Sequence, residues 1–288
     1  MKWSKKFLAV AAAMTMAFAA AGCGGGDNSG NAGGSDSADV EALLTKAQET
    51  MAGVESMATE MNMEISMAMG EESIDMITNA KVLTVNEPLK MQMDMSMDMG
   101  EMGSQDMQMF AEEKDGQFVT YINMDGAWYA QSATAESLAQ YDADANMDLY
   151  LKNISGFSKT GEEDVNGKTA SKIEGVLTGD AMKEAIQDSG ALSSVENMGL
   201  STEDMEALYS SDLPLTMWID ADGYVVKYEM DMTAMMQAVM DQAMASAGAE
   251  AGDAKIEISK TAVSMICKDF NAVEVEIPAE AANATVIG

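Results

Sequence analysis

Histidine and arginine are both absent from this chain of 288 residues. Without histidine the chain cannot form a Ser-His or Cys-His pair, in which the imidazole activates the nucleophile. Its 16 basic residues are all lysines, and 48 acidic residues bring the formal net charge to -32. Binding of DNA or RNA requires basic side chains that neutralise phosphates, so nucleic acid is excluded as a natural partner. We predict a protein that is not an enzyme and needs no cofactor.

Cysteine occurs only twice, as Cys23 and Cys267. Cys267 lies in a strand-like segment with no histidine to activate it, so we expect a small buried hydrophobic side chain rather than a nucleophile. If Cys23 carries a lipid, no intramolecular disulfide can form. The folded part must then hold together by packing alone, for which about 250 residues suffice.

The apolar run at the N-terminus is short. It extends from Phe7 to Ala21, whereas a membrane-spanning helix needs roughly 20 apolar residues. Lysines precede this run and small residues follow it, just before Cys23. This layout is typical of a signal peptide.

The residues that end the run, Ala20-Ala21-Gly22-Cys23, resemble the bacterial lipobox, although Ala20 stands where that pattern usually has Leu. The resemblance implies that residues 1–22 are a signal peptide that is removed, and that Cys23 becomes an N-terminus with a diacylglyceryl anchor. The protein would then be lipid-anchored at the extracytoplasmic face of the cell membrane. The alternative is an ordinary secretory peptide cleaved nearby.

Residues 23–38 are predicted to form the lipidated cysteine and a flexible tether. From Gly24 to Ala38 the chain contains only Gly, Asp, Asn, Ser and Ala, which bury too little apolar surface to order a segment. A random coil of this length reaches roughly 20 Å, enough to lift a domain clear of the lipid headgroups. Residues 39–288 contain no linker and are predicted to form one domain.

Hydrophobic periodicity predicts a helix followed by strands. Apolar residues recur at helical spacing from Asp39 to Met57. Two later segments alternate apolar and polar residues, which places the apolar side chains of each segment on one face of a strand. These apolar side chains are Met61, Met63, Ile65, Met67 and Met69 in the first segment, and Met91, Met93, Met95, Met97 and Met99 in the second.

Further strands are predicted along the rest of the domain, at 74–85, 106–113, 117–123, 127–131, 154–162, 168–177, 215–219, 224–233 and 255–267. Several are joined by Asp-Gly or Asn-Gly, dipeptides that connect antiparallel neighbours. Helices are predicted at 134–151, 180–192, 202–209 and 234–247, and a loop at 248–253. Since one face of each strand is apolar and the other polar, we predict an antiparallel meander with one buried face.

This order of elements resembles the LolA and LppX-like lipoprotein fold. Local strings also resemble an uncharacterised family of Gram-positive lipoproteins of that fold, namely Met51-Ala52-Gly53-Val54-Glu55-Ser56-Met57, Met217-Trp218-Ile219-Asp220-Ala221-Asp222-Gly223-Tyr224 and Phe270-Asn271-Ala272-Val273-Glu274-Val275-Glu276-Ile277-Pro278. The resemblance implies an α+β fold, a curved antiparallel sheet or half-barrel with helices packed on its concave apolar face. Members of the wider fold carry lipids or lipidated proteins in an apolar concavity.

The methionine stripes are therefore candidate ligand-binding residues for an acyl chain or another hydrophobic ligand, because thioethers adapt to varied apolar partners. The competing hypothesis is an ordinary filled core in an interaction lipoprotein whose acidic surface meets a basic partner.

Thioethers also bind Cu(I). Side chains two residues apart on a strand start about 6.6 Å from each other, so a shared copper ion would need side chains that bend together or come from neighbouring strands. The acids from Asp142 to Asp148 fail as a calcium loop, since Met147 and Asn153 occupy its Gly and Glu positions. We predict no metal site, and the sequence identifies no particular protein partner.

The lipid anchor can be tested by substitution. We expect Cys23→Ala to abolish incorporation of radiolabelled palmitate and to move the protein from the detergent phase to the aqueous phase in a Triton X-114 partition. Cys267→Ala, which removes the other thiol, should leave both properties unchanged. Continued acylation of the Cys23→Ala protein would contradict the lipoprotein hypothesis.

Overall fold

The computed structural model describes residues 34–70, 72–100, 103–114, 117–124, 126–133, 154–180, 183, 209–247 and 256–286. The predicted signal peptide, Cys23 and the first part of the tether lie outside these residues. So do the helix predicted at 134–151, the helix predicted at 202–209 except for Tyr209, almost all of the one predicted at 180–192, and the loop predicted at 248–253.

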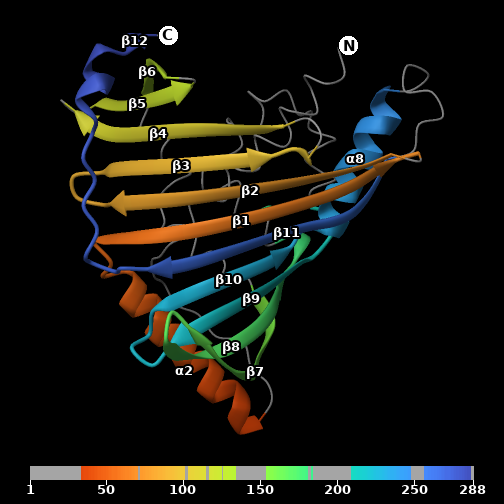
Figure 1. Ribbon diagram of the computed structural model, residues 1–288. Coiled ribbons are helices and arrows are strands. Elements are labelled where there is room, and N and C mark those ends of the chain that lie inside the picture. The colour runs from red at the N-terminus through yellow and green to blue at the C-terminus, as the bar shows by residue number, and fades with distance from the viewer. Residues whose placement is uncertain are drawn as a thin grey trace.

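The described residues form one large, open, curved antiparallel sheet, which is consistent with a half-barrel (Figure 1). Its order is β12-β6-β5-β4-β3-β2-β1-β11-β10-β9-β8-β7. The strands are β1 (Ser56–Met69), β2 (Glu72–Val85), β3 (Lys90–Asp98), β4 (Ser104–Lys114), β5 (Gln117–Met124), β6 (Ala127–Ala133), β7 (Ile154–Val165), β8 (Lys168–Leu177), β9 (Leu213–Asp220), β10 (Val225–Asp231), β11 (Ile256–Lys268) and β12 (Thr285–Val286).

The sheet consists of two meanders joined by a late strand. β1 to β6 run in chain order on one side, and β7 to β10 do the same on the other. β11 lies between them and pairs antiparallel with β1 and with β10. A strand from the end of the chain thus connects its two halves.

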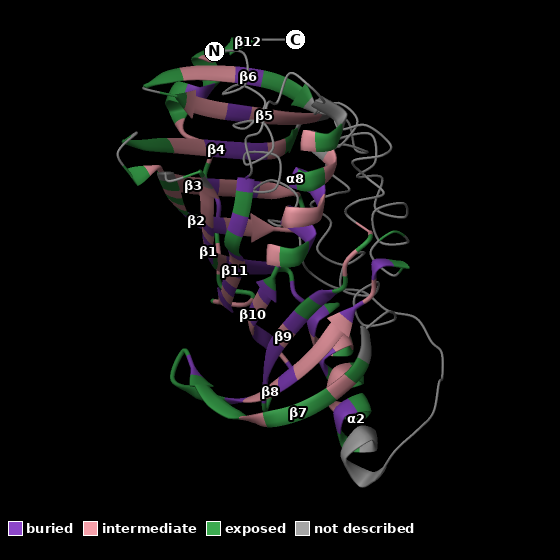
Figure 2. Ribbon diagram, turned by 90° about the vertical axis from the view of Figure 1, so that its right-hand side faces the viewer, coloured by how far each residue is buried: buried purple, intermediate pink, exposed green. Residues whose placement is uncertain are grey.

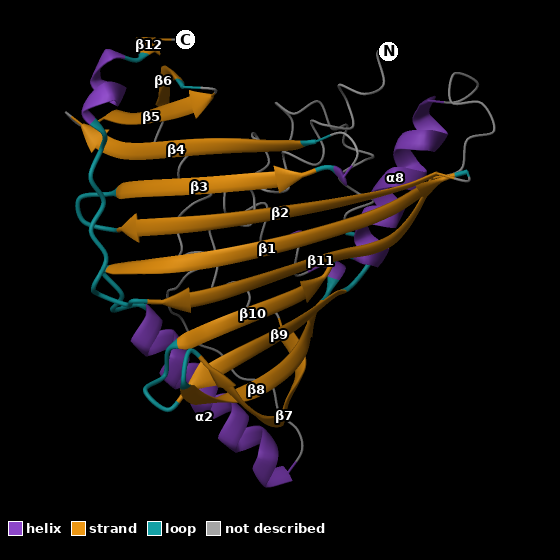
Figure 3. Cartoon of the chain, viewed as in Figure 1, coloured by secondary structure: helices purple, strands orange, loops and turns teal. Residues whose placement is uncertain are grey.

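Two longer helices among the described residues accompany the sheet, α2 (Gly34–Met51) and α8 (Thr233–Ala247) (Figure 3). Val40, Ala47 and Met51 of α2 are buried and belong to the main core cluster. Met235, Met236 and Val239 of α8 belong to the same cluster. A 3-10 turn, η3 (Ala279–Asn283), precedes β12 near the C-terminus.

The strand predictions are confirmed from β1 to β11, with differences of a few residues at their ends. The helix predicted at 234–247 is confirmed as α8. The helix predicted from Asp39 to Met57 is shifted, because α2 begins at Gly34, inside the predicted tether, and β1 already begins at Ser56. The first turn of α2 is polar and therefore gives no apolar periodicity. β12 and its parallel pairing with β6 were not predicted.

The two faces of the sheet differ in burial, and buried and less buried residues alternate along its strands (Figure 2). On β1, odd-numbered residues from Met61 to Ile65 are buried, while the even-numbered residues between them are half-buried and polar. We call the face to which Met61 and Met63 point the methionine face, and the opposite face the polar face. At one end of the sheet a cluster around Phe110 and Tyr121 packs against Val275 of the C-terminal segment.

The hairpin between β9 and β10 is fastened to α2. Lys46 Nζ donates to the carbonyl oxygen of Ala221 at 2.6 Å, and Thr50 Oγ1 donates to that of Asp222 at 3.3 Å. Gly223 completes the turn with a φ of +100°, a backbone conformation that L residues rarely adopt. A Cβ at Gly223 would lie 2.5 Å from Thr50 Oγ1. The close approach of α2 to this turn therefore requires glycine.

We expect Gly223→Ala to lower the free energy of unfolding by roughly 1–3 kcal/mol, because it adds backbone strain and a clash with Thr50. Gly126→Ala is the matched control, since Gly126 also has a positive φ but nothing within 4 Å of an added Cβ. Urea denaturation should show a larger loss for Gly223→Ala than for the control. Adding Thr50→Ala should recover part of the difference, and equal losses in both single variants would contradict the proposed contact.

Candidate functional site

The two predicted methionine stripes lie on the same face of the sheet but do not touch directly, because β2 separates β1 from β3. Along one row, Met61 of β1 lies beside Ala80 of β2, which lies beside Met95 of β3. Along the next row, Met63, Thr78 and Met97 follow one another in the same way. Strands are about 4.8 Å apart, so the two stripes are about 10 Å apart, with the short side chains of Ala80 and Thr78 between them in these two rows.

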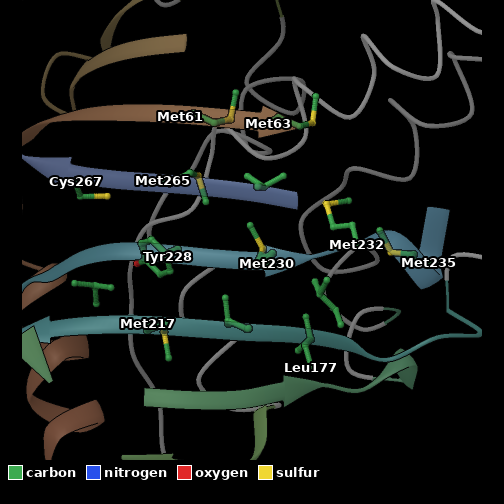
Figure 4. Packing of buried hydrophobic residues seen from close by; sticks show 14 of the residues in the cluster. Met61, Met63, Leu177, Met217, Tyr228, Met230, Met232, Met235, Met265 and Cys267 are labelled. Carbon is green, nitrogen blue, oxygen red and sulfur yellow. The ribbon is translucent and has the colours of Figure 1, made fainter. Parts of the chain in front are cut away.

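The rows continue on both sides of these strands. Met95 lies beside Met107 of β4. On the other side Met61 lies beside Met265 of β11, which lies beside Tyr228 of β10. Figure 4 shows Met61, Met265 and Tyr228 together with Met230, Met232 and Met235 in one cluster.

The methionine face has a buried part and a half-buried part. Five of the ten predicted ligand-binding residues are only 3–5% exposed, namely Met61, Met63, Ile65, Met91 and Met93. Another four are half-buried, namely Met67, Met95, Met97 and Met99. Met99 follows the end of β3, and the side chain of Met69 lies outside the described residues. The buried five serve as core, and Met67, Met95 and Met97 remain candidate contacts for a ligand on this face, whereas Met99 lines a cavity on the opposite face.

Several residues of this face were missed in the sequence-based prediction. Met107 and Met109 of β4 and Val263 and Met265 of β11 lie on it. Apolar and polar residues alternate in both β4 and β11, so the sequence indicates which side chains share a face of each strand. Nothing in the sequence shows that β11 lies beside β1, and these residues were missed because the order of the strands was unknown.

Cys267 is 2% exposed on the same face. Its sulfur lies 3.9 Å from Thr59 Oγ1, across the β1–β11 pair. Burial raises the pKa of the Cys267 thiol to about 11. The side chain is therefore a neutral part of the core at physiological pH, in agreement with the prediction of a small buried hydrophobic residue.

Among the described residues, two buried side-chain hydroxyl groups lack a hydrogen-bond partner, Thr261 Oγ1 and Tyr209 Oη. Thr261 is fully buried on β11 next to Ile65 of β1. An unpaired buried hydroxyl costs about 1–3 kcal/mol. In the part of the chain that the structure describes, no three His, Cys, Asp or Glu side chains gather as metal ligands would.

None of the described helices has the length and hydropathy that crossing a membrane requires. The fold and the site define a class of protein, one with a curved antiparallel sheet, an apolar, methionine-rich face and helices packed into its core. Residues 39–286 match the model of a family of unknown function, DUF6612, and the chain belongs to this family. No curated protein sequence matches the chain.

Solved structures with a similar layout include three lipoprotein-related proteins. LppX, a lipoprotein from Mycobacterium tuberculosis, is 13% identical, and the match covers 83% of this chain and 99% of LppX at a TM-score of 0.46. LprF from Mycobacterium bovis is 14% identical, with coverages of 85% and 98% and a TM-score of 0.48. A LolA superfamily protein from Nitrosomonas europaea is 8% identical, with coverages of 82% and 94% and a TM-score of 0.25.

LppX and the LolA superfamily protein carry the names of the fold that the sequence resembles. What this chain binds is inferred below from the properties of its own two faces.

Burial of Cys267 gives a prediction about reactivity and pH. We expect the thiol of the folded Cys23→Ala protein to resist Ellman's reagent and to react after unfolding in urea. Because the folded pKa is about 11 and the ordinary value is 9.0, the unfolded thiol ionises first as the pH rises. The free energy of unfolding should therefore fall between about pH 9 and about pH 11. Cys267→Ala in the same background should lack this component of the pH dependence, and rapid labelling of the folded protein would contradict the burial.

Proposed function

We propose that this chain is a membrane-anchored extracytoplasmic lipoprotein that binds an acyl chain or a similar hydrophobic ligand against the half-buried part of its methionine face. The lipid on Cys23 and the tether that ends at α2 would hold the domain close to the membrane. No catalytic step is part of this proposal.

One observation carries the proposal. Met67, Met95 and Met97 remain half-buried although they lie on strands in the interior of the sheet and on its apolar face. A soluble domain usually covers such side chains completely, and an incompletely covered apolar patch indicates a binding surface.

The side chains around this patch also favour a flexible apolar ligand. Ala80 and Thr78 on β2 are short, whereas the methionines on either side of them are long. Thioether side chains can rearrange around ligands of different shape.

The alternative is an interaction lipoprotein with a filled core. It is favoured by the nearly complete burial of Met61, Met63, Met91 and Met93 and by the net charge of -32, which would attract a basic partner. The sequence resemblance implies that helices pack on the concave apolar face, and helices that covered this face completely would leave no site for a ligand. Met235 and Met236 of α8 share a cluster with Met63, and we propose that α8 covers that end of the face.

The ligand can be sought by native mass spectrometry and lipid extraction on a soluble form that starts at Gly24 and is purified from its own host without detergent. We expect a co-purifying acyl lipid. Combined Met67→Gln, Met95→Gln and Met97→Gln should weaken binding of a fluorescent fatty acid at least tenfold, or about 1.4 kcal/mol, because polar amides replace apolar contacts.

Leucine at the same three positions is the matched control and should retain binding, since it preserves the apolar surface. Circular dichroism should show that both variants are folded. A ligand-free protein that ignores added fatty acids and phospholipids would overturn the proposal and favour the filled core, and pull-downs for a basic protein partner would then follow.

A further inference from the structure

The polar face of the sheet carries a trough, which is independent of the hydrophobic site proposed above. The trough crosses β11, β1, β2, β3 and β4 and has a volume of about 1230 Å³. Its floor is strand backbone, including that of Met61, Ala80 and Met95, whose side chains belong to the methionine face. We call this cavity the polar trough.

One wall of the polar trough is a row of short polar side chains in strand register, Ser264, Asn62, Asn79, Ser96 and Asp106. Neighbouring strands are about 4.8 Å apart, so four steps give a row about 19 Å long. The groups in this row are amides, hydroxyls and one carboxylate. They present hydrogen-bonding atoms at a regular spacing.

The other wall is a parallel row two residues away along each strand, Glu60, Lys81, Asp94, Gln108 and Asn123. Asp94 is held in a fixed orientation, because Gln108 Nε2 donates to its Oδ1 at 2.6 Å and Gln92 Nε2 donates to its Oδ2 at 2.8 Å. Such a carboxylate is preorganised to accept a hydrogen bond from a ligand. The two rows together bound a shallow, open trough.

The amides of the polar trough can both donate and accept. Asn62 Nδ2 donates to Asn79 Oδ1 at 3.0 Å. An amide carries two N–H donors and a carbonyl oxygen with two lone pairs, so this bond leaves the pair with capacity for a ligand. The backbone groups beneath them are used in the sheet ladders, and recognition therefore falls to the side chains.

The charges of the polar trough lie partly in pairs. Its lining holds three carboxylates, Glu60, Asp94 and Asp106, and one ammonium group, Lys81, which lies between the first two in register. Lys268, which is not part of the lining, forms an ion pair with Glu60, so that Asp94 and Asp106 against Lys81 leave a local net charge of -1. A strongly charged ligand would not select this site over the rest of the surface.

From these observations we infer that the polar trough binds a neutral oligosaccharide. Sugar hydroxyl and acetamido groups both donate and accept hydrogen bonds, as the Asn, Gln and Ser side chains of the two rows do. An extended oligosaccharide also repeats its polar groups along its length, which fits a row about 19 Å long. Ile266 lines one end of the trough and offers an apolar contact for the face of a sugar ring.

The test is isothermal titration calorimetry with chitotetraose, cellotetraose and maltotetraose. It uses the full-length protein purified from membranes in a detergent without sugar groups. At least one of the three should bind with a dissociation constant of about 1 mM or below. The combination of Asn79→Ala and Ser96→Ala, which removes two adjacent groups from the centre of one row, should weaken that binding at least tenfold.

The combination of Thr216→Ala and Ser132→Ala is the matched control. Both residues lie on the polar face but outside the trough, so affinity should not change. The combined glutamine substitutions at Met67, Met95 and Met97 should also leave it unchanged, which separates this inference from the proposed lipid site. Failure of all three tetrasaccharides to bind, or equal loss of binding in the trough and control variants, would overturn the inference. So would binding of the cationic polyamine spermidine in their place.

Discussion

The pairing of β11 with its two neighbours is the interaction on which the rest of the structure depends. β11 contacts β1 through twelve register pairs and β10 through five, and without it the two meanders would be separate sheets. Val263, Met265 and Cys267 of β11 are all buried beside residues of β1. Because β11 is near the end of the chain, the core is completed only when the C-terminal part joins the N-terminal part. Such long-range pairing is slow to form.

Strict alternation along the strands then gives the sheet two independent surfaces. On β1 to β3, one set of residues brings methionines, Ala80 and Thr78 to the core side, and the residues between them bring amides, hydroxyls and charges to the other side. A shift of one residue in the register would exchange the two sets. The proposed lipid site and the polar trough therefore depend on the same register, although their ligands would differ in every chemical respect.

Methionine side chains in this protein lie both in the buried core and on the half-buried part of the sheet. Met61, Met63, Met91 and Met93 pack the sheet where most proteins place branched residues, and Met67, Met95 and Met97 remain half-buried on the same strands. An unbranched thioether can adapt to either setting, which explains why one residue type satisfies both. The acidic character is carried by the remaining surface, where lysines such as Lys260 and Lys268 pair with carboxylates of β1.

The sequence by itself determined the strands from β1 to β11, helix α8 and the apolar face of each strand, because these features follow from local periodicity and turn residues. It also indicated the ten residues of the methionine stripes. It did not determine that β11 joins β1 to β10, because that strand order depends on contacts between residues about 200 positions apart. The division of the stripes into buried and half-buried parts, and the polar trough, were decided only by the tertiary structure, since both arise where several strands lie side by side.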